Sequence, residues 1–157
     1  MRSGAGRWVL GDWQLNGIFS AYSGAPLNLT FSTATLNAPG NGNRPNIAGK
    51  PEIFGAVGRG ALWFDTGKFS APPTASFGNA GRNILNGPGL VNLDFSLFRK
   101  IPIAERLGAE LRVEAFNLTN TPHFNNPGGT FGSADFGQVT GARADQRQFQ
   151  FALKLIF

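Results

Sequence analysis

A strict alternation of apolar and polar residues recurs along this chain, and it restricts those segments to β structure. The clearest case is RQFQFALKLIF at 147–157, whose odd-numbered residues are apolar from Phe149 to Phe157. The same parity recurs in WQLNGIFSAYSGAPLNLTF at 13–31, VNLDFSLFRK at 91–100 and AELRVEAFNL at 109–118. Each segment therefore predicts a strand with one apolar face and one mostly polar face.

The composition supports an all-β chain. There are 22 Gly and 10 Pro residues, which disfavour helices, and 15 Phe residues, which suit a pleated surface. The absence of cysteine excludes disulfides and thiolate metal sites. The net charge is +5, but the basic residues are scattered singly, which does not indicate a nucleic-acid-binding face.

The connections between the predicted strands alternate in length. Residues 32–90 and 119–146 form long loops rich in Gly, Asn and Pro, whereas residues 100–108 form a short turn. Short turns at one end and long loops at the other are typical of outer-membrane β-barrels, whose turns are periplasmic and whose loops are extracellular. Three of the four segments also have about the 9 to 11 residues that a tilted strand needs to cross the membrane.

The apolar faces of these strands need a cover. In an outer-membrane barrel lipid covers them, and Phe157 would lie at the periplasmic interface, where aromatic residues gather. In a soluble protein a second sheet would cover them, so a carbohydrate-binding β-sandwich is the alternative fold. A second alternative is a short chain that oligomerises to close a pore-forming barrel. Antiparallel transmembrane barrel strands with long extracellular loops remain our principal prediction.

Three stretches resemble a known family. They are GDWQLNGIFSAYSGAPLNL, then WFDTGKFSAPPTASFGNAGRNILNGPGLVNLDFSLFRKIPIAERLGAELRVEAFNLTNTPHFNNP, and finally FQFALKLIF. Together, from about Gly11 to Phe157, they look like the C-terminal end of the TonB-dependent outer-membrane receptors. The most similar branch carries an N-terminal carboxypeptidase-regulatory-like domain.

The resemblance implies a plugged barrel of about 22 strands that imports a scarce nutrient, such as a glycan, a peptide or a siderophore-like compound. With only four strands predicted, we expect residues 1–157 to be the C-terminal part of a longer barrel. The implied partners are outer-membrane lipid, the remaining strands and plug, TonB through that plug, and the barrel-assembly machinery. The assembly signal would comprise Phe151, Leu153, Leu155 and Phe157.

Two groups of residues are candidates for function. The first is a charge cluster facing the barrel lumen, formed by Asp94, Glu110, Arg112 and Glu114. Its alternative role is a structural ion-pair ladder, which the spacing favours. The second is an extracellular ligand mouth, formed by Arg44, Arg59, Trp63, Phe64 and Arg82. The alternative for these residues is packing of the long loop against the barrel rim.

No catalytic or cofactor-binding pattern is present in the sequence. His123 is the only histidine, and without cysteine or a second histidine it does not predict a metal site, so we expect a loop position at the outer rim. The Gly-rich stretches complete neither a dinucleotide nor a phosphate-binding motif. We therefore expect a membrane transport protein that is not an enzyme and has no cofactor.

Overall fold

The computed structural model describes residues 4, 11–31 and 42–157 and divides the chain into two compact units. We name the first the sheet unit (Met1–Ala21, Val91–Pro122 and Asp145–Phe157) and the second the loop unit (Tyr22–Leu90 and His123–Ala144). Across residues 11–31 and 42–157, the only helical element is a single 3-10 turn, η1 (Thr66–Lys68). The prediction of an all-β chain is confirmed.

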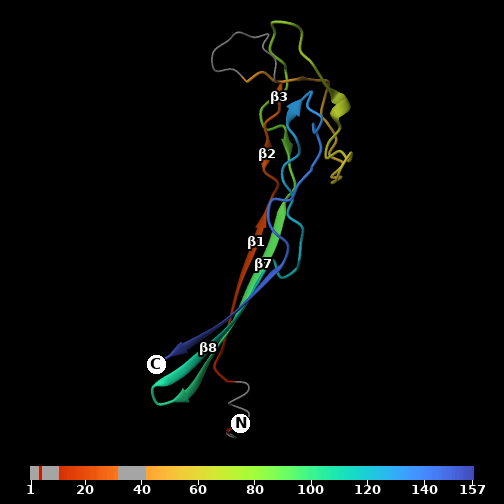
Figure 1. The fold of residues 1–157 in the computed structure, drawn as a ribbon. Helices are drawn as coiled ribbons and strands as arrows, with labels where there is room; N and C mark the ends of the chain where they lie inside the picture. Colours follow the sequence, from red (N-terminus) through yellow and green to blue (C-terminus); the bar gives the residue numbers. More distant parts are fainter. Residues whose placement is uncertain (1–3, 5–10, 32–41) are drawn as a thin grey trace. The chain divides into compact units, whose positions relative to one another are not determined.

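The sheet unit contains one four-stranded sheet (Figure 1). Its spatial order is β1 (Trp13–Tyr22), β7 (Leu90–Ala104), β8 (Leu107–Phe116) and β10 (Gln148–Ile156). β8 pairs antiparallel with both β7 and β10, so that Leu97, Val113 and Phe151 lie side by side on one row. Odd-numbered residues therefore share one face across these strands, and even-numbered residues share the other.

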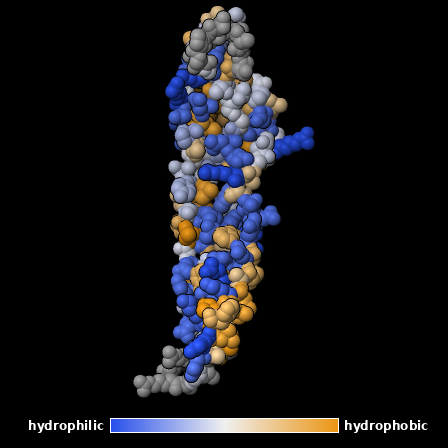
Figure 2. All heavy atoms as spheres, turned by 60° about the vertical axis from the view of Figure 1, so that its left-hand side comes forward, coloured by the Kyte–Doolittle hydropathy of each residue, from blue (hydrophilic) through white to orange (hydrophobic). Residues whose placement is uncertain are grey.

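The odd face of this sheet is apolar apart from Arg99, and on β1 and β10 it is open to its surroundings. On β10 its residues are 55–71% exposed, and they comprise Phe149, Phe151, Leu153 and Leu155. Leu15 and Phe19 of β1 are equally open. Figure 2 shows apolar residues gathered beside hydrophilic ones on this part of the surface. Such an extended apolar surface on one side of a sheet requires a partner other than water.

The turn between β7 and β8 is shorter than predicted. The sequence suggested a connection over 100–108, but pairing continues to Ala104 and Leu107, leaving only Glu105 and Arg106 in the turn. A register shift between Pro102 and Ala104 accompanies this tight connection. Proline lacks the N–H needed to continue a regular ladder, which accounts for the irregularity at this point.

The first predicted strand is interrupted. In place of one strand over 13–31, the structure has β1, then β2 (Pro26–Leu27) and β3 (Thr30–Phe31). The break falls at residues 23–25, where Gly24 approaches the backbone of Gly87 so closely that a Cβ atom would overlap its carbonyl oxygen. The same parity is kept on both sides of the break, which is why the sequence pattern looked continuous.

The long loops fold into the loop unit, which is built from three two-stranded sheets. β2 pairs with β6 (Leu85–Asn86), β4 (Asn46–Ile47) pairs with β5 (Phe69–Ser70), and β3 pairs in parallel with β9 (Thr130–Phe131). These sheets enclose a core formed by Leu27, Leu29, Phe64, Phe69, Leu85 and Phe136. Backbone hydrogen bonds such as that from the Trp63 N–H to the Gly137 carbonyl, at 2.7 Å, join the two long loops into one folded body.

Candidate ligand-binding site

A pocket lies on the even face of the sheet unit. It has a volume of about 730 Å³, within the range of small-molecule sites. Its lining comes from β1, β7 and β8 and from Asp12 just before β1, and it consists of Asp12, Trp13, Gln14, Asn16, Phe98, Lys100, Pro102, Glu110 and Arg112. Because side chains alternate along a strand, the even-numbered residues of this lining share one surface. Trp13 is odd-numbered, and its ring lies 5.0 Å from the guanidinium carbon of Arg99, a residue of the odd face.

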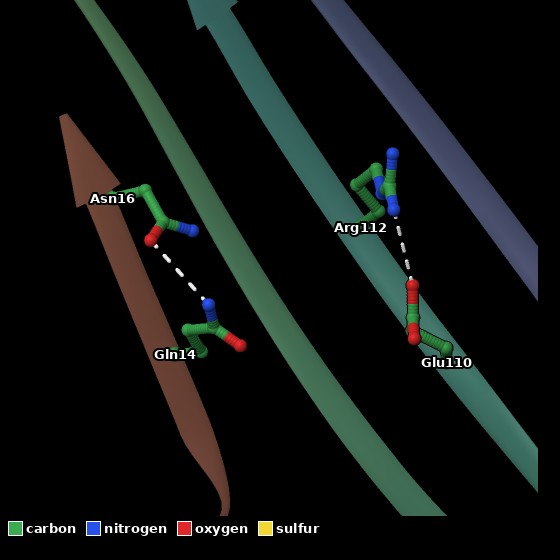
Figure 3. Close-up of polar contacts among 4 residues, drawn as sticks. All are labelled: Gln14, Asn16, Glu110 and Arg112. Carbon is green, nitrogen blue, oxygen red and sulfur yellow. Dashed lines mark hydrogen bonds and ion pairs between the residues drawn. The ribbon is translucent and has the colours of Figure 1, made fainter. Parts of the chain in front are cut away.

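Charged residues form a row across the sheet at this pocket. Lys100 of β7 and Lys154 of β10 are both register partners of Glu110 on β8. Arg112, two residues further along β8, donates from Nη2 to Glu110 Oε1 at 3.2 Å (Figure 3). The Glu110 side chain is only 16% exposed, whereas that of Arg112 is 44% exposed. One partly buried carboxylate therefore lies among three cationic residues.

Arg112 is also held by an aromatic ring. Its guanidinium carbon lies 4.6 Å from the ring centre of Phe98, its register partner on β7. A guanidinium group over a ring face gains cation–π attraction and keeps its N–H groups in a fixed plane. The contacts with Phe98 and Glu110 together orient Arg112 before any ligand arrives.

Two amide side chains form the opposite side of the pocket. Gln14 and Asn16 lie on β1, and the Gln14 amide donates to Asn16 Oδ1 at 3.4 Å (Figure 3). Both amides retain further donors and acceptors for a ligand. Charged side chains and neutral amides thus face the same pocket.

The structure brings together only part of the predicted charge cluster. Glu110, Arg112 and Glu114 share the even face, but Glu114 is paired in register with Ser96 and Gln150. Asp94 lies beyond the paired region and accepts hydrogen bonds from Asn92 Nδ2 at 2.9 Å and from the Asn117 backbone N–H at 2.8 Å. Asp94 therefore fixes the end of β8 and is not part of the ion pair. Lys100 and Lys154 were missed because their positions depend on the hairpin register.

The five residues of the predicted ligand mouth have different environments, and none lines the pocket. Phe64 is fully buried in the core of the loop unit, so its ring does not face a ligand. Trp63 packs against that core and donates from Nε1 to the Asn86 carbonyl at 2.9 Å. Arg44 donates to the Ala80 carbonyl at 3.0 Å, while Arg59 and Arg82 are exposed. Burial of aromatic area within the folded loop accounts for the positions of Phe64 and Trp63.

His123 is also more buried than expected. It is only 4% exposed within the loop unit, and its carbonyl accepts from the Arg143 backbone N–H at 2.7 Å. Among the described residues, no group of three or more His, Asp and Glu side chains is arranged to hold a metal ion. Within the same residues, no helix is long and apolar enough to cross a membrane.

Comparison with known families identifies the class of protein. Residues 1–150 match the model of the outer membrane beta barrel domain. The chain belongs to this family. No curated protein and no solved structure matches it significantly.

Membership in the outer membrane beta barrel domain family explains the two faces of the sheet. Strands of such barrels place apolar residues toward lipid and polar residues toward the lumen. The odd face with Phe151 and Leu153 is accordingly the lipid face, and the even face with the pocket is the lumen face. The predictions of an antiparallel outer-membrane barrel fold and of an outer-membrane location are confirmed.

Proposed function

We propose that this chain forms the C-terminal strands of a TonB-dependent outer-membrane transporter that takes up a nutrient. In this proposal the chain is not an enzyme, and its partners are lipid, the other strands and plug of the receptor, TonB through the plug, and the barrel-assembly machinery. A glycan, a peptide and a siderophore-like compound are the candidate nutrients. The order of segments that resembles the TonB-dependent receptors is what distinguishes this proposal from other barrel functions.

The observation that carries the proposal is the open sheet. Within the part of the chain that the structure describes, β1 pairs only with β7, and β10 pairs only with β8. Unpaired backbone N–H and C=O groups cost several kcal/mol each in lipid, so both edges need further strands. A large single-chain barrel supplies them. The folded loop unit is consistent with the large extracellular loops of such a barrel.

An oligomeric pore is the second candidate, because copies of this chain could also satisfy the open edges. Closure of a barrel from several copies would require β10 of one copy to pair with β1 of the next. That arrangement leaves the apparent mass of each denatured polypeptide at 16.7 kDa. A soluble sandwich is disfavoured by the family match and by the exposed apolar face.

Cell fractionation followed by immunoblotting tests the proposal. An antibody against residues 119–146 is used on outer-membrane fractions, and each sample is run unheated and boiled. We expect a band in the outer membrane several times larger than 16.7 kDa, with heat-dependent migration and with formaldehyde cross-linking to TonB. A band at 16.7 kDa in that membrane would support the oligomeric pore and overturn the proposal.

A further inference from the structure

The row of charged residues around Glu110 has more positive than negative charge. Lys100 and Arg112 line the pocket, and Lys154 extends the same row on β10. Within the lining itself these two cations balance the carboxylates of Glu110 and Asp12, and Lys154 adds one further positive charge beside it. Since Glu110 is already bonded to Arg112, the lysines on either side can stabilise an additional anion. Enclosure by the rest of a barrel would strengthen this attraction by reducing access of water.

The planar guanidinium of Arg112 favours a planar anion. Its guanidinium is oriented by Phe98 and uses Nη2 to reach Glu110. The N–H groups not directed at Glu110 can bind a carboxylate with two parallel hydrogen bonds. A preoriented arginine loses less conformational freedom on binding, which increases affinity.

The remaining lining residues suit a ligand that carries many hydroxyl groups. The amides of Gln14 and Asn16 can both donate to and accept from neighbouring hydroxyl groups. Phe98 provides aromatic surface against which the C–H groups of a sugar ring can pack. The volume of about 730 Å³ accommodates one or two sugar rings.

We infer that this pocket is a binding site for a carboxylate-bearing saccharide, such as a uronic acid unit of an acidic glycan. Arg112 and Lys100 bind the carboxylate, Lys154 adds positive charge beside them, and Gln14 and Asn16 bind ring hydroxyls. An acidic peptide would use the cations but would leave the paired amides of β1 without a regular array of hydroxyls. The inference rests on the proposed transport function and deepens it by naming the substrate class.

Calorimetric titration of the protein extracted from outer membranes in detergent tests this site. The probes are a uronic acid disaccharide and the neutral disaccharide with the same linkage. We expect binding of the acidic sugar that weakens as salt is raised, and much weaker binding of the neutral sugar. Lys100→Gln should weaken acidic-sugar binding about tenfold, the effect of losing one charge-assisted hydrogen bond. Lys50→Gln, at an exposed position of the loop unit, should leave the affinity unchanged.

Arg112→Lys tests whether the planar guanidinium of Arg112, and not only its positive charge, is needed for binding. The variant keeps the positive charge but loses the planar pair of donors, so it should also bind the acidic sugar about tenfold more weakly. Heat-dependent gel migration checks that each variant is folded. Equal affinity for both sugars, equally tight binding of a triglutamate peptide, absence of binding, or unchanged affinity in both pocket variants would each overturn the inference. A purified 16.7 kDa protein that binds the acidic sugar would contradict the transporter proposal alone.

Discussion

Phe64 is the centre of the aromatic core in the loop unit. Its ring meets those of Phe69 and Phe136 edge to face, with centroids 5.7 and 5.4 Å apart. Phe64→Ala should destabilise this unit by about 3 to 5 kcal/mol, because it removes a fully buried ring and leaves a cavity. Limited trypsin digestion of the folded protein should show faster cleavage within residues 42–90. Phe77→Ala, at a position 58% exposed, is the control and should digest at the original rate.

Gly78 lies where the backbone of the loop unit approaches itself. A Cβ atom at this position would overlap the carbonyl oxygens of Arg44 and Pro45. Gly78→Ala should therefore destabilise the loop unit by about 1 to 3 kcal/mol through overpacking. Gly42→Ala is the matched control, since a Cβ atom there meets nothing within 4 Å. Equal thermal unfolding temperatures for the two variants would contradict this close approach.

For individual side chains, the sequence predicts the face of the strand but not the partners on neighbouring strands. The parity of Glu110, Arg112 and Glu114 was predicted, because alternation fixes a face without knowledge of neighbouring strands. The partners Lys100 and Lys154 were not predicted, because a shift of the turn by one residue would have moved them to other rows. The burial of Phe64 and His123 depends on contacts between segments far apart in the sequence.

At the scale of elements, adjacent residues of β7 point in opposite directions, one toward lipid and the next toward the lumen. Leu97 lies in the middle of the odd-numbered series from Val91 to Ile103, which is apolar except for Arg99, while Ser96 is paired with Glu114 on the other face. Leu97→Lys should destabilise the barrel by about 2 to 4 kcal/mol, the cost of a lysine on the lipid face near the membrane centre. Ser96→Lys should cost little because the new ammonium group faces Glu114. The folded fraction after heating in detergent, read by gel migration, compares the two variants.

Two of the long strands were predictable to within two residues, but the short ones were not. Residues 109–118 and 147–157 correspond closely to β8 and β10, since nine or ten alternating residues give a clear period. The pairs β2–β6, β3–β9 and β4–β5 contain two residues per strand and carry no period. Their pairing comes from the core formed by Leu27, Leu29 and Phe64, which only the folded chain assembles.

At the scale of the whole molecule, the question is how the sheet enters the membrane as part of a closed barrel. The lipid-facing side chains of β10 are largely exposed, and Phe157 beyond it is 97% exposed. The open edge of β10 is the edge that another strand must meet. The resemblance to TonB-dependent receptors assigns Phe151, Leu153, Leu155 and Phe157 to recognition by the assembly machinery.

Substitution of Phe157 tests this assignment. Phe157→Ser should lower the amount of folded protein in the outer membrane, because it removes the aromatic group that the assembly machinery is expected to bind. Ile156→Ser is the matched control, since residue 156 belongs to the opposite face and should leave assembly nearly unchanged. Quantitative immunoblots of outer-membrane fractions, normalised to total synthesis, provide the measurement. Equal loss in the two variants would indicate a general requirement for apolar residues at this end of the sheet, and no loss in either would remove Phe157 from the assembly signal.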